Sequence, residues 1–291
     1  MSKRKADAET ASKTKMDIDG DDSGSDDDVD MINVDFEWFD PEPEIDFHGI
    51  KTLLRQLFDV DNKLFDLSAL ADLILSQPQL GSTIKCDGKE SDPYAFLTVL
   101  NLNQHRAVPA VKCLTDYLVS KSSSRMGGSL GKLGELLAQP NAQVGLILSE
   151  RFINMPHQVV PPLYNMIREE IANAVKDGKP CKFTHYLILS KTYTEVESQL
   201  DAEDNPPSKK SKAGKSPSSE VFYFHPEDEA IHKHTFDFHT YDYTNQSEGE
   251  SDAKRTFQEL GIKPRGHLMA LDAIGFEGAV KSVTEYLSVE A

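Results

Sequence analysis

The chain has 291 residues, of which 38% are hydrophobic, enough to bury the core of one large domain or two small ones. Its formal charge of −17 disfavours direct binding to nucleic acid, because a phosphate backbone repels a surface of this sign. Three widely spaced cysteines without a CxxC motif indicate a reducing compartment. The sequence begins without the apolar region of a signal peptide, and no stretch approaches the ~20 apolar residues of a membrane span.

The negative charge is concentrated toward the two ends of the chain. Residues 1–40 carry five basic and thirteen acidic residues, residues 41–200 carry sixteen and eighteen, and residues 201–291 carry ten and seventeen. This distribution is typical of a near-neutral domain whose acidic ends serve a partner.

Residues 1–30 are poor in aromatic residues and rich in Asp, Ser and Lys, so they are expected to form a disordered acidic tail. The remaining segment, 31–291, is expected to fold. Polar stretches without apolar periodicity predict disordered inserts within it, at about 120–132, 201–219 and 245–253.

The first half of the folded segment predicts a half-buried strand, two amphipathic helices, two strands and a third helix. The first strand alternates apolar and acidic residues, and prolines end it. The second helix is expected to begin with Asp66 as its N-cap. The expected bounds are 32–39, 46–58, 66–75, 82–86, 94–102 and 109–119.

The second half predicts a short helix, a buried strand, a long helix opened by two prolines, and then strands with two further helices. Helices and strands are mixed along the whole chain, which predicts one α/β domain with a mixed sheet. The expected bounds are 133–138, 143–148, 161–175, 183–196, 220–224, 226–231, 235–243, 267–274 and 276–287.

Residues 127–131 match the G-x-S-x-G pattern of a nucleophile elbow. That elbow needs a buried strand before the serine, whereas a Ser-rich loop precedes Ser129, so we expect a loop and no catalytic residue. Leu133 stands where a P-loop needs a hydroxyl after Gly131-Lys132, which excludes a phosphate-binding loop.

Four histidines fall within fifteen residues, and imidazoles at such spacing can bind zinc. No cysteine is nearby, and aromatic residues alternate with the last histidine as in an ordinary strand. We therefore expect no metal site and no cofactor at these four positions, which are His225, His232, His234 and His239.

Two groups of acidic residues are candidate partner-binding positions. One lies in the tail, and the other stands at the expected start of a helix, where acidic residues are equally well explained as a solvated, dipole-favoured N-terminus. The six positions are Asp26, Asp27, Asp28, Glu227, Asp228 and Glu229.

Short linear signals are expected in the same polar segments. Ser23 and Ser25 are followed three residues later by an acidic residue, the pattern that acidophilic kinases prefer, so we expect phosphorylation there. Short basic runs predict nuclear import. These runs contain Lys3, Arg4, Lys5, Lys209, Lys210 and Lys212.

Two longer runs resemble one family. Residues 34–41, followed by 46–51, are similar to the opening of the BCCIP family, and so are residues 149–156, followed by 161–164. The resemblance covers roughly residues 32–290, and an acidic tail is typical of the family.

The resemblance implies a protein of the nucleus, shuttling to the cytoplasm, without catalytic activity and with a fold like that of the GNAT acetyltransferases. Fungal members of the family are linked to nuclear export and to guarding a large-subunit ribosomal protein, so the implied partners are a basic protein and nuclear transport factors.

Two alternatives stay open. One is an acetyl-CoA-dependent transferase of the GNAT type, and the other is a trafficking adaptor for a lipid-kinase cargo. A GNAT site needs an Arg/Gln-x-x-Gly-x-Gly/Ala loop between a strand and a helix to hold the cofactor's pyrophosphate on backbone N–H groups. The nearest match, residues 125–130, ends in Leu130 and follows a loop, which disfavours the transferase.

Overall fold

The structure is a computed structural model and describes residues 35–77, 79–123, 128–195, 221–245 and 262–288. The expected tail at 1–30, the insert at 201–219 and nearly all of that at 245–253 lie outside these ranges.

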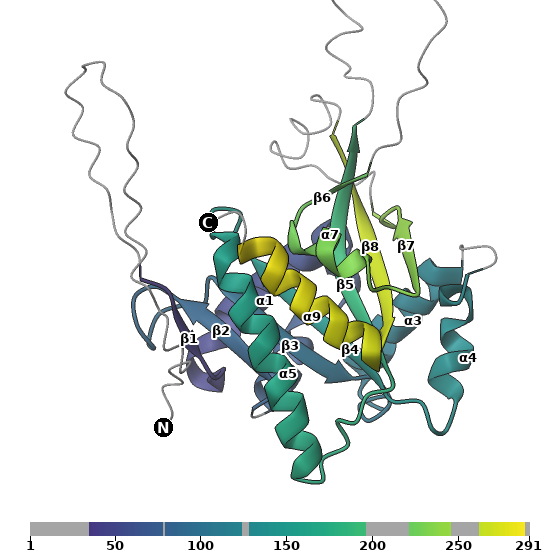
Figure 1. Cartoon of the computed structure of the whole chain (residues 1–291), viewed down its shortest axis with the longest axis horizontal. Helices are drawn as coiled ribbons and strands as arrows, with labels where there is room; N and C mark the ends of the chain where they lie inside the picture. Colours follow the sequence, from purple (N-terminus) through teal and green to yellow (C-terminus); the bar gives the residue numbers. More distant parts are fainter. Residues whose placement is uncertain (1–34, 78, 124–127, 196–220, 246–261, 289–291) are drawn as a thin grey trace, which may run out of the picture.

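Eight strands form one mixed sheet through the middle of the molecule (Figure 1). Seven of them follow the order β1-β2-β3-β4-β5-β8-β7, and β6 pairs separately with β5. Every pairing is antiparallel except that of β4 with β5. The strands are β1 (Glu37–Phe39), β2 (Gly81–Lys85), β3 (Ala95–Asn101), β4 (Val144–Arg151), β5 (His185–Glu195), β6 (Val221–Tyr223), β7 (Asp237–Tyr241) and β8 (Ile262–Asp272).

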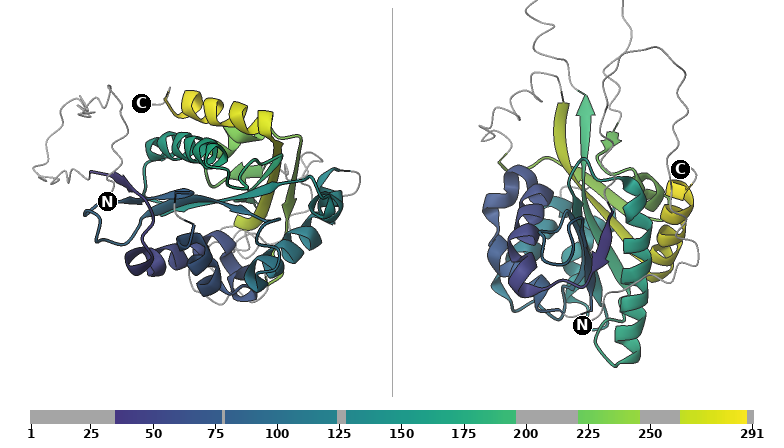
Figure 2. Two further views of the ribbon diagram at one scale, coloured as in Figure 1. Left: turned by 90° about the horizontal axis from the view of Figure 1, so that it is seen from below. Right: turned by 90° about the vertical axis from the view of Figure 1, so that its left-hand side faces the viewer.

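Helices cover both faces of this sheet (Figure 2). One layer contains α1 (Pro43–Phe58), α2 (Leu67–Leu75), α3 (Pro109–Ser123) and α4 (Leu133–Ala138), with the 3-10 turns η1 (Asp59–Leu64) and η2 (Leu130–Lys132). The other contains α5 (Val160–Lys176), α7 (Glu227–His232) and α9 (Ala273–Ser288), with η3 (His157–Val159). Helix α5 makes the crossover that the parallel strands β4 and β5 require.

Alternation along the central strands divides the core into two halves. Leu146 and Leu148 of β4 pack with the α1–α4 layer, whereas Ile147 between them packs with the α5–α9 layer. Strand β5 repeats the pattern, with Leu187 on the first side and Ile188 on the second. These strands are buried on both faces, which explains their continuous apolar sequences.

The predicted mixed α/β domain is confirmed, and most predicted helices and strands lie within a few residues of the observed ones. The backbone N–H of Ala69 donates to the Asp66 carboxylate at 3.0 Å, so the predicted N-cap is confirmed. Helix α1 begins at Pro43, before the expected Asp46, because proline fits the first turn of a helix. The described part of the first strand is only Glu37–Phe39.

The disordered insert predicted at 120–132 is wrong at both of its ends. Helix α3 continues to Ser123, and η2 occupies Leu130–Lys132, while residues 124–127 lie outside the described part. Long-range contacts hold both ends: Lys121 donates to the Asp242 carbonyl at 2.6 Å, and the Leu130 N–H donates to the Asp237 carboxylate at 2.7 Å. A polar composition could not indicate these contacts.

Replacing Gly266 of β8 with alanine should destabilise the fold. A Cβ atom there would overlap the ring of Tyr241 on the neighbouring strand and lie 2.7 Å from its hydroxyl oxygen. Overpacking of this kind costs ~1–3 kcal/mol. Chemical denaturation of Gly266→Ala measures the loss. Gly134→Ala in α4, where the nearest atom is 3.5 Å away, is the control and should be neutral or stabilising. Equal effects at both sites would contradict the expected overlap.

Candidate functional site

The site lies where the two parallel strands separate. Strand β4 pairs with β5 from Val144 opposite His185 to Leu148 opposite Leu189, and no further. Beyond that point β4 continues along β3 alone, while β5 keeps β8 on one edge and receives the short strand β6 on the other. The carboxyl ends of β4 and β5 therefore diverge, which is where open α/β sheets place ligands.

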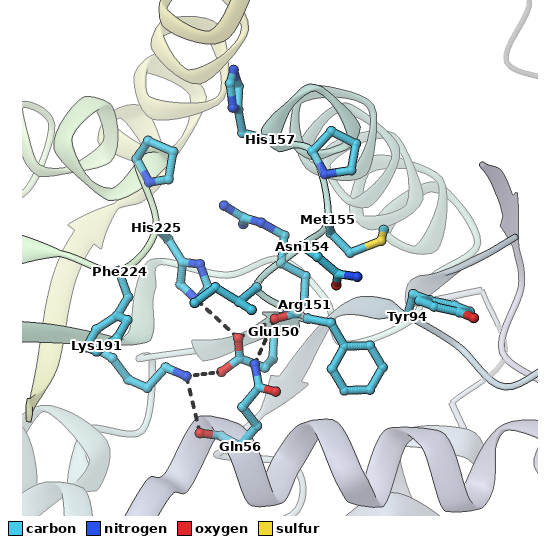
Figure 3. Close-up of a pocket in the computed structure, with 14 residues that line it drawn as sticks. Gln56, Tyr94, Glu150, Arg151, Asn154, Met155, His157, Lys191, Phe224 and His225 are labelled. Carbon is cyan, nitrogen blue, oxygen red and sulfur yellow. Dashed lines mark hydrogen bonds and ion pairs between the residues drawn. The ribbon is translucent and has the colours of Figure 1, made fainter. Parts of the chain in front are cut away.

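A pocket of about 740 Å³, here called the splay pocket, opens at this divergence (Figure 3). Its lining comes from α1, the start of β3, the end of β4, the loop that follows β4, and the β5–β6 region. Tyr94 and Lys191 stand on opposite sides of it in Figure 3. The lining residues are Gln56, Tyr94, Glu150–His157, Lys191 and Phe224–Pro226.

The floor of the splay pocket is a buried ionic network centred on Glu150. The Lys191 ammonium lies 2.6 Å from one carboxylate oxygen of Glu150, and the His225 imidazole lies 3.2 Å from the other. Burial alone would raise the pKa of Glu150, but the charges and hydrogen bonds of Lys191 and His225 outweigh it and hold the pKa at about 2. For His225, the Glu150 carboxylate likewise outweighs burial and raises the pKa. This carboxylate is therefore a poor general base near neutral pH.

A second buried group stands behind the first. The Arg151 guanidinium makes a bidentate ion pair with Glu227, and the Ser190 hydroxyl donates to Asp228. Burial raises the pKa of Asp228 to about 7, partly offset by the charge of His225. A carboxyl with this pKa suits acid–base chemistry, but Asp228 does not line the splay pocket.

These contacts correct the expected acidic docking surface. Glu227 and Asp228 are each 3% exposed, so their carboxylates make contacts inside the protein and are not available to a partner. Only Glu229 is exposed, where its carboxylate accepts a hydrogen bond from the Tyr286 hydroxyl at 3.1 Å. Three acidic residues at a helix start suggested side chains exposed to solvent. Instead, Glu227 is buried in an ion pair with Arg151, which lies 76 residues earlier in the chain.

The network also closes the free backbone edge of β4. The Gln56 side-chain amide donates to the Arg151 carbonyl at 2.8 Å, and the Arg151 N–H donates to the Glu150 carboxylate at 3.0 Å. Lys191 further donates to the Gln56 carbonyl at 3.2 Å, as the dashed lines of Figure 3 show. Side chains of the protein thus occupy the hydrogen-bonding positions that an extended ligand would need at this edge.

The start of the helix that follows β4 offers few backbone donors for an anion. A GNAT-type cofactor loop would have to connect a strand to a helix. In this sheet residues 151–162 make such a connection, between β4 and α5, whereas the closest match to the GNAT motif is at residues 125–130. Helix α5 begins Val160-Pro161-Pro162, and prolines have no N–H. The N–H groups of Val159 and Val160 already donate within the preceding 3-10 turn, at η3. This helix start therefore has few free N–H groups for a phosphate.

Glu150, Arg151 and Lys191 were not predicted from the sequence as residues of the site. A signal was present, because the first two are charges at the end of a buried apolar strand and Lys191 lies inside another. Buried charges require partners of opposite sign, so these residues could have been expected to meet.

The four clustered histidines do not gather into one site, although His232 and His239 both lie near His267. His225 joins the Glu150 network, His234 lies 2.6 Å from the Ser282 hydroxyl, and His232 stacks on His267 of β8 with ring centroids 5.9 Å apart. Burial, with the nearby histidines, lowers the pKa of His267 to about 3. Within the described ranges, no three His, Cys, Asp or Glu residues are arranged to hold a metal ion.

The other motifs and candidate residues considered from the sequence are not among the described residues that line the splay pocket. Among the described residues, the element before Ser129 is helix α3, which ends at Ser123, and not the strand that a nucleophile elbow needs. None of the described helices combines the length and apolarity needed to cross a bilayer. The other candidate positions lie outside the described residues: Asp26, Asp27, Asp28, Ser23, Ser25, Lys3, Arg4, Lys5, Lys209, Lys210 and Lys212.

Asp228→Asn should stabilise the protein in a pH-dependent way. The folded chain keeps a proton on Asp228 up to a pKa of about 7, whereas the unfolded chain releases it near 3.8. Wild-type stability therefore falls as pH rises through this window, by on the order of a few kcal/mol at ~1.4 kcal/mol per pKa unit. Asparagine cannot ionise, so its advantage in melting temperature should grow across the window and then level off.

Thermal denaturation over this pH range tests the expectation. Asp72→Asn, on the exposed face of α2, is the matched control. If the two variants differ from the wild type by the same amount at every pH, Asp228 does not hold a proton in the folded state.

The chain is similar to known proteins over nearly its whole length. It is 57% identical over 272 residues to Protein bcp1 of Aspergillus oryzae, covering 93% of this chain and 92% of the relative. It is 51% identical over 266 residues to Protein bcp1 of Schizosaccharomyces pombe, covering 90% and 92%.

The fold is similar to the crystal structure of BCP1 from Saccharomyces cerevisiae. The TM-score is 0.59 and the identity 31%, over 90% of this chain and 93% of that one. The profile of the BCCIP family matches residues 31–231. The protein therefore belongs to the BCCIP family.

Proposed function

We propose that this chain is a non-enzymatic binding protein that escorts a basic protein, a large-subunit ribosomal protein, and takes part in ribosome biogenesis and nuclear export. The observation that carries the proposal is the placement of negative charge. Residues 35–46, at the start of the described fold, contain six acidic residues and no basic one. Asp46 is buried against Lys85, and the other five continue the acidity of residues 1–34. Ribosomal proteins carry basic surfaces for RNA, which an acidic surface covers by charge complementarity.

The states of two carboxyl groups, one lining the splay pocket and one behind it, support a role without catalysis. Glu150 is held ionised by two cationic partners, so it is a poor base. Asp228, whose pKa would suit proton transfer, is enclosed away from the pocket.

The proposal includes residence in the nucleus with shuttling to the cytoplasm. The basic runs that include Lys3-Arg4-Lys5 and Lys209-Lys210 would be recognised by import factors. Phosphorylation of Ser23 and Ser25 would add ~1.5 to 2 negative charges at each site and strengthen the attraction for a basic client.

The purified full-length chain should bind a purified basic ribosomal protein, with an affinity that falls steeply as salt is raised. Replacing Asp26, Asp27 and Asp28 with asparagine should weaken binding and flatten the salt dependence. The matched control replaces Glu169, Glu277 and Glu285 with glutamine, which removes the same charge from the α5–α9 layer.

Titration calorimetry at several salt concentrations provides the measurement. Pull-down from cell extract at moderate salt, followed by mass spectrometry, would identify the client. The proposal fails if the wild-type chain binds no basic ribosomal protein.

The second candidate is an acetyl-CoA-dependent transferase with a GNAT-like fold. The divergence of the parallel strands β4 and β5 favours it, because such a crevice is a place for a cofactor. The prolines of α5 and the closed edge of β4 oppose it. Calorimetry with acetyl-CoA should therefore detect no binding, and micromolar affinity would replace the first proposal with this one.

A trafficking adaptor for a lipid-kinase cargo is a third possibility. It would share the nuclear signals, and a kinase among the captured proteins in place of ribosomal proteins would favour it.

A further inference from the structure

The mouth of the splay pocket is apolar although its floor is ionic. Tyr94 packs edge to face against Phe152 with ring centroids 5.9 Å apart, and Phe224 lies under the Lys191 ammonium at 5.6 Å. Ile153, in the loop after β4, is 93% exposed and lines the same pocket. An isoleucine so fully exposed beside aromatic rings offers apolar surface to a partner.

The charged groups of the floor already have partners of opposite charge within the protein. Glu150 is held by Lys191 and His225, and Arg151 is held by Glu227. A ligand group that enters the pocket therefore gains little from carrying charge, whereas apolar atoms gain by leaving water. The pocket is thus suited to one large apolar side chain.

Acidic residues, here called the acidic rim, lie in the turn that leads to Tyr94 of this mouth and at the start of α1: Asp87, Glu90, Asp92 and Glu42. The first three belong to the turn between β2 and β3 and are exposed, and only Pro93 separates Asp92 from Tyr94. The one basic residue of that turn, Lys89, makes an ion pair with Glu42 at the start of α1. The rim therefore keeps a strong net negative charge.

The rim is fixed relative to the pocket. The Phe152 N–H donates to the Tyr94 carbonyl at 3.1 Å, which joins the end of the turn to the loop after β4. Pro93 lies so close to Gly49 of α1 that no Cβ atom fits between them. The turn that contains Asp87, Glu90 and Asp92 is thus attached both to the loop after β4 and to α1.

We propose that this surface docks an extended basic segment of a partner protein, with one large apolar side chain in the splay pocket and flanking lysines or arginines on the acidic rim. The inference rests on the proposed function and gives it a location. A second copy of the chain does not fit, because its net charge of −17 repels the rim. Buried apolar anchors carry most of the affinity of such interfaces, and rim charges set the encounter rate and the salt dependence.

The test uses the full-length protein and a fluorescein-labelled peptide in which one leucine is flanked by lysines. Fluorescence anisotropy measures the affinity at several salt concentrations. A peptide with serine in place of the leucine should bind about tenfold more weakly, a change of ~1.4 kcal/mol.

Ile153→Ser should weaken binding of the leucine peptide by a similar factor and leave the serine peptide unaffected. The matched control is Ile274→Ser at the start of α9, where the side chain is 83% exposed and far from the splay pocket lining. Both changes are on the surface and leave the core intact.

The double variant Glu90→Gln with Asp92→Asn should reduce the salt dependence. Glu277→Gln with Glu285→Gln on α9 removes the same charge and should not. Equal effects of the two isoleucine variants, or of the two charge variants, would overturn the proposed location.

The outcomes separate this inference from the proposed function. A wild-type chain that binds neither the peptide nor a basic ribosomal protein would refute both. Binding of a basic ribosomal protein that is insensitive to Ile153→Ser and to the rim variants would leave the proposed function standing and refute the docking surface.

Discussion

The separation of β4 from β5 is the constraint on which the rest of the structure depends. A parallel pair that stops pairing midway exposes two backbone edges and the charges at the strand ends. The protein resolves this by inserting β6 against β5 and by placing Lys191 and His225 against the two oxygens of Glu150. Buried ions of this kind are costly when any one partner is lost, so the arrangement fixes the relative positions of α1, β4 and the β6–α7 connection.

This constraint also explains why a crevice that could hold a ligand is partly filled by the chain itself. Gln56 reaches from α1 to the end of β4, and Lys191 reaches back to the same helix. What remains open is the outer part of the crevice, with aromatic residues at its mouth and carboxylates beside it. Under the proposed function, this outer part would receive a segment of a partner polypeptide.

Periodicity predicted the fold well because the elements are amphipathic or continuously apolar. Strand β4 and helix α1 needed no more than their own residues to be found, and the Asp66 cap is a local interaction within one turn. The prediction of secondary structure failed where contacts with residues distant in the sequence determine the conformation. Lys121 and Leu130 are ordered by residues of β7 and the segment after it, and the polar sequence between them contains no trace of this.

The candidate site was harder to predict for the same reason. Glu227 and Asp228 looked like a solvated helix start, and only their contacts with Arg151 and Ser190 show that they are internal. The splay pocket depends on which strands neighbour each other, and that order is not contained in any one motif. The family inferred from the resemblance is confirmed by the family profile, which matches residues 31–231. The runs that showed the resemblance include the end of β4 and the loop after it.

The start of α5 has a consequence for how this fold could change over evolution. Replacing one of the two prolines would restore only one N–H, and the preceding 3-10 turn would still hold the N–H of Val160, so a single substitution cannot turn that corner into a phosphate cradle. Gaining such a cradle would require several simultaneous changes and the rebuilding of the turn. In this chain, the paired prolines thereby oppose phosphate binding at that corner more durably than the loss of any one reactive group would.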